Sequence, residues 1–148
     1  MEKSGFIFKF YDKAYEDKSI EELCEAPVSA ISGISESDAT DLKKAFGIET
    51  VEDLATNKYV RLAQGINCFS ECSGQVLEKT FESKVFANLA RKPVSEISGI
   101  SEEDATLLKR AFGIDNIMEL AVNKYVLIAQ TTVAMASMLQ LLRAAGIL

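Results

Sequence analysis

Residues 27–48 have the sequence PVSAISGISESDATDLKKAFGI, and residues 93–114 repeat it almost unchanged as PVSEISGISEEDATLLKRAFGI. Pro93 follows Pro27 by 66 residues, and the flanking segments keep the same offset, so that Lys79 matches Lys13. Similarity of a chain to itself at one fixed spacing indicates a duplicated structural unit. The sequence therefore predicts one module used twice.

Each copy predicts a tight turn that leads into a helix. Gly33 lies where the chain must reverse, because glycine reaches positive φ without a side-chain clash. Ser35 is placed to cap the following helix, and Asp38 three residues later completes a capping box. Gly47 then ends the helix as a left-handed C-cap. The second copy has the same residue types at Gly99, Ser101, Asp104 and Gly113.

The predicted helix has one apolar stripe. The first copy forms the stripe with Ala39, Leu42, Ala45 and Phe46, and the second with Ala105, Leu108, Ala111 and Phe112. These positions follow the period of an α-helix that packs one side on a core. Asp41, Lys43 and Lys44 fall outside the stripe.

The pattern resembles the helix-hairpin-helix motif. In that motif an apolar residue, two glycines around a second apolar residue, an alanine and a leucine or isoleucine stand at set positions. The matching residues are Ile31, Gly33, Ile34, Ala39 and Leu42, and then Ile97, Gly99, Ile100, Ala105 and Leu108. Ser35 and Ser101 replace the second glycine, which in the family lets a DNA phosphate come close. The continuation is similar to repeats in the N-terminal domains of archaeal recombinases and the C-terminal domain of the RNA polymerase alpha subunit.

We predict an all-α fold of two tandem repeats of about 66 residues, each with one helix-hairpin-helix motif, in a pseudo-twofold arrangement. Residues 1–9 form an N-terminal extension, residues 10–75 the first repeat, and residues 76–148 the second repeat with an apolar C-terminal helix. The spacing of Phe8, Tyr11 and Tyr15 predicts an early helix, with a strand over Phe6–Phe10 as the alternative.

Further capping signals divide the rest of each repeat into helices. Ser19 is expected to cap a short helix that ends before Pro27. Capping boxes are expected from Thr50 with Asp53 and from Asn116 with Glu119. Extended helices are expected over residues 57–81 and 123–148.

Composition restricts the function classes. Sixteen basic and twenty-two acidic residues give a net charge of −6, which opposes a general attraction to nucleic acid. Histidine and tryptophan are absent from the sequence, and no catalytic motif is recognisable, so we expect no enzyme activity and no cofactor. Three cysteines and the lack of a signal peptide favour the reducing cytoplasm.

Cysteine pairing is the remaining chemical candidate. Cys68 and Cys72 lie on one side of a helix and offer two thiolates to zinc, or a redox-sensitive pair. Their counterparts in the second copy are Ala134 and Met138, which indicates apolar packing instead. We therefore predict no metal site. Phe46, Tyr59, Phe112 and Tyr125 also recur at matching positions, as core packing requires.

The family resemblance implies a second use of the turns, namely contact with the backbone of double-stranded DNA without sequence preference. The implied contact residues are Gly33, Ile34, Ser35, Lys43, Lys44, Gly99, Ile100, Ser101, Lys109 and Arg110. Acidic residues at both helix starts repel a phosphate at the same place: Glu36, Asp38, Glu102, Glu103 and Asp104.

Two hypotheses of function follow. The first is a noncatalytic interaction or scaffold module, in a nucleic-acid-processing context, that binds a protein partner or forms a homodimer through residues 125–148. The second is DNA binding through the turns. A membrane span over residues 125–148 is disfavoured, because Gln130, Thr131, Thr132, Gln140 and Arg143 interrupt the apolar run.

Overall fold

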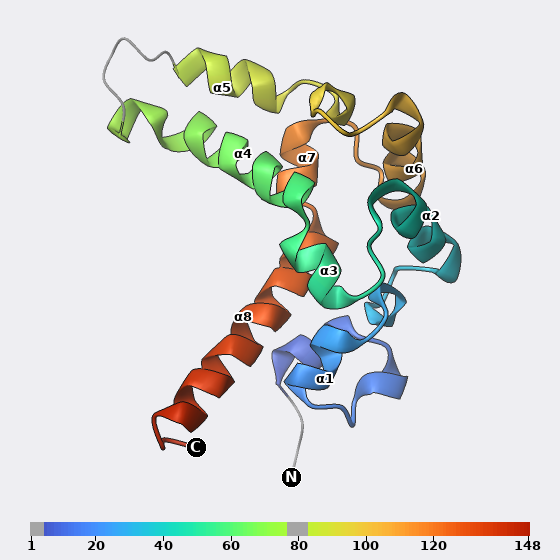
Figure 1. The fold of residues 1–148 in the computed structure, drawn as a ribbon, viewed down its shortest axis with the longest axis vertical. Coiled ribbons are helices and arrows are strands. Elements are labelled where there is room, and N and C mark those ends of the chain that lie inside the picture. The colour runs from blue at the N-terminus through green and yellow to red at the C-terminus, as the bar shows by residue number, and fades with distance from the viewer. Residues whose placement is uncertain (1–4, 77–82) are drawn as a thin grey trace.

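The computed structural model describes residues 5–76 and 83–148, with side chains for 5–71 and 85–148. These residues form helices and contain no named strand, which confirms the all-α prediction (Figure 1). The first four α-helices are α1 (Ile20–Glu25), α2 (Glu36–Phe46), α3 (Val51–Thr56) and α4 (Lys58–Val76). They are followed by α5 (Ser83–Ala90), α6 (Glu102–Phe112), α7 (Ile117–Ala121) and α8 (Lys124–Ala144). Short 3-10 helices are η1 (Phe6–Phe10), η2 (Lys13–Tyr15), η3 (Val28–Ala30) and η4 (Val94–Glu96).

The turn-and-helix unit has the predicted local geometry in both copies. Gly33 and Gly99 each have a φ of 100°, and the C-caps Gly47 and Gly113 each have a φ of 70°. Both serines cap their helix in a complete capping box. The other predicted caps are also confirmed, at Ser19, Thr50 and Asn116. These ends are set by residues three or four apart, which is why the sequence predicts them.

The N-terminal prediction is wrong. Instead of one helix through Phe8, Tyr11 and Tyr15, two 3-10 helices are separated by Tyr11 in an extended conformation. The strand alternative is also wrong, because Phe6–Phe10 is itself 3-10 helical. Tyr11 is buried and its hydroxyl lies 2.7 Å from the hydroxyl of Thr132. The backbone of Tyr11 also forms an antiparallel bridge with Ile31, in which the Asp12 N–H donates to the carbonyl oxygen of Ala30, and this pairing holds Tyr11 in extended geometry.

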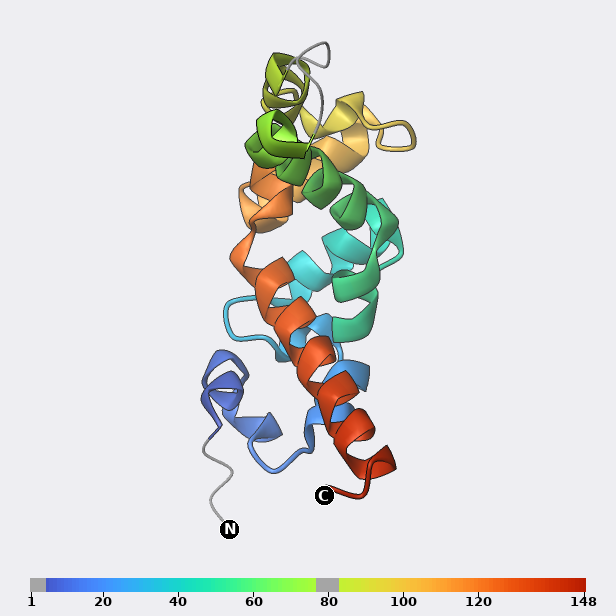
Figure 2. The same ribbon diagram turned by 90° about the vertical axis from the view of Figure 1, so that its left-hand side faces the viewer.

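The long helices are exchanged between the two halves of the chain. Helix α4 packs on α5 and α7, whereas α8 packs on α1 and α3. Figures 1 and 2 show α4 lying beside α5 at one end of the molecule and α8 running to the opposite end beside α1. Helices α2 and α6 pack against each other. Contacts therefore join the halves throughout, and the predicted division between residues 75 and 76 stays a prediction.

A reciprocal pair of side-chain amides joins α4 to α8. The side-chain nitrogen of Gln64 donates to the side-chain oxygen of Gln130 at 2.7 Å, and the nitrogen of Gln130 donates back at 2.8 Å. Each nitrogen also donates to a backbone carbonyl of the opposite half, at Ala121 and Ala55 respectively. Gln130 follows Gln64 by 66 residues, so the two copies meet at equivalent positions.

Within the described part of the chain, one segment, Ile117–Ala144, is long and apolar enough to cross a membrane by length and composition. Core helices of soluble proteins pass the same criterion. Helix α7 ends at Ala121, and the side chain of Asn123 caps α8, so the helix is interrupted inside this segment. One side of α8 is buried on α1 and α3.

Candidate functional site

Each hairpin turn is covered by a tyrosine from the other half of the chain. The Tyr125 hydroxyl donates to the carbonyl oxygen of Gly33 at 3.3 Å, and the Tyr59 hydroxyl donates to that of Gly99 at 3.4 Å. A Cβ added to Gly33 would lie 2.6 Å from the Tyr125 hydroxyl, and one added to Gly99 would meet the Tyr59 hydroxyl in the same way. At each turn the absence of a Cβ therefore allows a tyrosine hydroxyl of the same protein to lie close to the glycine.

Neighbouring side chains hold both tyrosines in place. The rings of Phe112 and Tyr125 lie 4.9 Å apart between centroids, and those of Phe46 and Tyr59 lie 5.1 Å apart. The ammonium groups of Lys124 and Lys58 stand over the two tyrosine rings at 4.9 and 5.0 Å, within the range of a cation–π contact. All four rings are half-buried. Sequence reasoning assigned these aromatics to packing but missed their contact with the turns.

The capping boxes give two amides at each helix start a partner within the chain. The backbone N–H of Ser35 donates to the Asp38 carboxylate at 3.1 Å, and that of Asp38 donates to the Ser35 hydroxyl at 3.0 Å. Ser101 and Asp104 make the same pair of bonds at 3.2 and 3.0 Å. Free amides at a helix start bind anions, so these carboxylates occupy the place that a phosphate would need.

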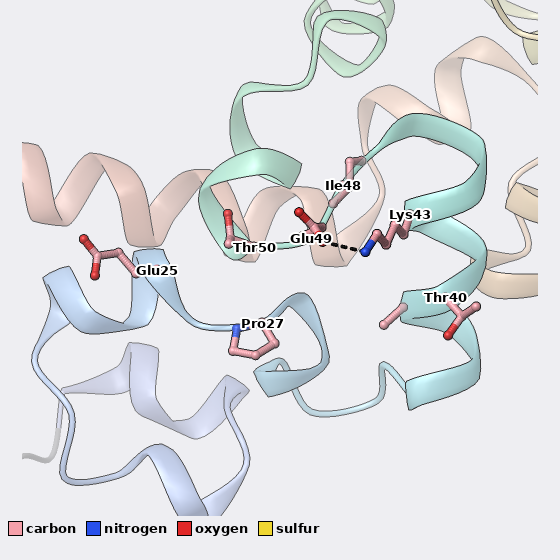
Figure 3. Close-up of a pocket in the computed structure, with 8 residues that line it drawn as sticks. Glu25, Pro27, Thr40, Lys43, Ile48, Glu49 and Thr50 are labelled. Carbon is pink, nitrogen blue, oxygen red and sulfur yellow. Dashed lines mark ion pairs between the residues drawn. The ribbon is translucent and has the colours of Figure 1, made fainter.

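Two of the predicted DNA-contact lysines make ion pairs with carboxylates of the chain. Lys43 lies 2.8 Å from Glu49, and both side chains are exposed. Both residues line a pocket of about 460 Å³ beside α2 (Figure 3). Glu25, the last residue of α1, and Pro27 also line it. Lys109 pairs with Asp115 in the second copy. The hydrogen bonds that the two ammonium groups donate to these carboxylates raise the pKa of both lysines.

Arg110 on α6 makes an ion pair with Asp41 on α2, so it joins the two helices that follow the turns. Its guanidinium donates two hydrogen bonds to Asp41, at 2.9 and 2.7 Å. These bonds hold the pKa of Asp41 below its usual range and raise the pKa of Arg110. Asp41 is only 4% exposed, which corrects the expectation that it lies outside the buried stripe. The signal was present in the sequence, because the equivalent residue of the second copy is the apolar Leu107.

Lys44 is the remaining predicted cation, and it is exposed. It borders a pocket of about 570 Å³ between α2 and α6 that also contains Arg110, Glu103 and Asp104. The structure thus brings Lys44 and Arg110 together, but beside two carboxylates. Ile34 and Ile100, the apolar residues of the turns, are buried.

Comparison with known families bears on the first of these turns. A family model described as a SAM-like helix-hairpin-helix tandem matches residues 25–66. The chain contains a helix-hairpin-helix region. Comparison with curated proteins and with solved structures gave no significant match. The helix-hairpin-helix region extends from the end of α1 into α4 and includes the first turn, whereas the second turn lies outside the match and its assignment as a repeat stays a prediction.

The two cysteines whose side chains the structure describes differ in burial. Cys24 is buried with its sulfur 3.9 Å from the carbonyl oxygen of Thr132, and burial raises the pKa of its thiol. Cys68 is exposed, and the side chain of Cys72 lies outside the described residues. Among the residues that are described, no three or more metal-binding side chains form a group.

Proposed function

We propose that this protein is a noncatalytic interaction module of the cytoplasm, in which the helix-hairpin-helix elements hold the two halves of the chain together. The observation that carries the proposal is the crossed contact of Tyr125 with Gly33 and of Tyr59 with Gly99. In each contact the glycine carbonyl accepts a bond from the other half. The turns act as internal joints and leave the outer surfaces of the helices for partners.

Electrostatics supports the same proposal. A phosphate that approached either helix start would meet the capping carboxylate of Asp38 or Asp104, and it would compete with that carboxylate for the same amide. Lys43, Lys109 and Arg110 would each have to leave an ion pair to reach DNA. The net charge of −6 adds a general repulsion.

A second candidate function is contact with the backbone of double-stranded DNA, which the match of residues 25–66 favours. In this candidate, Gly33 and Gly99 would approach the phosphates, and Lys44 would supply exposed positive charge. It requires that both tyrosines leave the turns and that the ion pairs open.

A titration of the full chain against a fluorescent 30-base-pair duplex at low salt separates the two functions. The interaction module predicts no saturable rise in anisotropy. DNA binding predicts a saturable rise that falls steeply with added salt, because neutralised phosphates release counterions. In that case the double variant Lys43→Glu/Lys109→Glu should abolish binding, and the proposal of closed turns would be abandoned.

A further inference from the structure

Helix α8 has one buried side and one apolar side without a partner in the described chain. The buried side faces α1 and α3 with Val126, Ala129, Thr132 and Ala136. On the opposite side, Leu127, Met138 and Leu141 are 46%, 54% and 63% exposed. Figure 1 shows that the C-terminal half of α8 extends away from α3, with α1 on one side only.

The exposed residues follow the spacing of a coiled-coil seam. Steps of four and three residues connect Leu127, Thr131, Ala134, Met138, Leu141 and Ala145, and all six are exposed. A period of 3.5 residues keeps a seam facing a second helix along its whole length. Any exposed face of an α-helix, including one that lies on lipid, has steps of three and four residues. The spacing is therefore compatible with a second helix, and the sizes of the six side chains are what favour one.

We propose that the occupant of this seam is α8 of a second copy of the chain, packed antiparallel. This inference rests on the proposed function and names its partner. In the antiparallel register each contact layer pairs a large residue with a small one. Leu127 meets Ala145 of the second copy, Leu141 meets Thr131, and Met138 meets Ala134, so that the same surface is used on both sides as a twofold axis requires.

Charge supports self-pairing. No charged residue lies between Lys124 and Arg143 on α8, so two copies bring no like charges together along the seam. Antiparallel packing also places the positive end of one helix beside the negative end of the other. Specific protein interfaces bury about 1,200 Å² or more in total, which is the area that a stable pair has to reach.

Sedimentation velocity of the full chain from micromolar to millimolar concentration tests the pairing, with two matched variants. Met138→Glu puts a carboxylate in the seam and should weaken the dimer by roughly a hundredfold or more, because a buried charge without a partner is costly. Gln140→Glu adds the same charge at an exposed position on the other side of α8 and should leave the dimer unchanged. A wild-type monomer throughout, or a dimer that Met138→Glu does not weaken, would overturn the proposal.

Disulfide cross-linking tests the orientation in a chain with Cys68 and Cys72 changed to serine. An equal mixture of Leu127→Cys and Ala145→Cys chains should form a cross-linked heterodimer. Leu127→Cys alone should not cross-link, because the two sulfurs would be roughly 27 Å apart, given the helical rise over eighteen residues. Cross-linking of Leu127→Cys to itself would contradict the antiparallel arrangement.

Two further outcomes identify other occupants. If the chain stays monomeric but floats with neutral phosphatidylcholine vesicles, and Met138→Glu prevents this, the seam binds lipid and the proposal fails. The DNA titration gives an independent result. A dimer that binds duplex DNA would uphold the seam and overturn the proposed function, whereas a monomer that binds no DNA would overturn the seam alone.

Discussion

At the scale of single residues, the two hairpin glycines differ from the other glycines in what stands next to them. Gly33 and Gly47 both have positive φ, but only Gly33 has a tyrosine hydroxyl within reach of an added Cβ. The space beside Gly47 is empty to at least 4 Å. Because φ is 100° at Gly33 and 70° at Gly47, backbone strain also differs between them, and removal of the Tyr125 hydroxyl isolates the cost of the tyrosine contact.

We predict that Gly47→Ala lowers the free energy of unfolding by roughly 1–2 kcal/mol, the cost of a left-handed alanine. Gly33→Ala should cost more, roughly 2–4 kcal/mol, because overpacking against Tyr125 adds to the strain. In a Tyr125→Phe background, without the hydroxyl, the difference between the two alanine variants should shrink. Urea unfolding measures all six chains, and equal costs at both glycines would show that Tyr125 does not approach the turn.

The buried Tyr11 gives a pH-dependent prediction. Burial raises the pKa of its phenol from 10.0 to about 12. As the pH rises above 10, the unfolded chain ionises first, so the contribution of Tyr11 to stability is complete below pH 10 and is lost between pH 10 and about 12. The loss amounts to about 2–3 kcal/mol at most, since one pKa unit is 1.36 kcal/mol.

Urea unfolding at pH 9 and pH 11.5 tests this loss. Tyr11→Phe has no ionisable group and should lose less stability between the two pH values than the wild type does. Other groups ionise equally in both chains, so the difference between them isolates Tyr11. An identical loss in both chains would mean that Tyr11 is not buried.

Sequence predicted residue contacts only over short separations. Both serine capping boxes were predicted because their partners are three residues apart. The tyrosine contacts with the turns join residues 92 and 40 positions apart, and no local pattern encodes them. Asp41 was misplaced although the apolar Leu107 at the equivalent position indicated burial, whereas its bond to Arg110, 69 positions away, had no local signal.

At the scale of elements, the amide pair of Gln64 and Gln130 joins helices α4 and α8. We predict that Gln64→Ala and Gln130→Ala each cost about 0.5–1.5 kcal/mol, typical of a lost hydrogen bond. The double variant should cost less than the sum, by about 1 kcal/mol, because the two side chains share their bonds. Urea unfolding of the four chains in the cycle gives this coupling, and strict additivity would contradict the reciprocal pair.

Capped helix starts were predictable, but helix partners were not. The helix predicted over residues 123–148 ends at Ala144, and the end predicted at residue 81 lies outside the described residues. The caps of α2, α3, α6 and α7 are encoded by side chains at fixed offsets. Helix α4 packs on the second half of the chain and α8 packs on the first. This exchange is set by tertiary packing, and a repeat in the sequence does not specify it. The 3-10 helices near Tyr11 were missed because the backbone pairing of Tyr11 with Ile31 overrides the local helical spacing.

At the scale of the whole molecule, the exchange of long helices predicts that the chain unfolds as a unit. Neither half keeps its packing once the other unfolds, because α4 covers α7 and α8 covers α3. We expect one cooperative transition, with equal calorimetric and van't Hoff enthalpies. Two resolved transitions in scanning calorimetry would instead show that the halves are stable separately.

The chain closes its own hairpin turns with Tyr59, Tyr125 and the capping carboxylates, and amide chemical shifts test this closure residue by residue. Addition of duplex DNA to the ¹⁵N-labelled full chain at low salt should leave the amide signals of Gly33, Ile34, Ser35, Gly99, Ile100 and Ser101 unmoved. Saturable shifts concentrated at these six residues would contradict this closure. They would show that DNA binds at the turns in place of the tyrosines and the capping carboxylates.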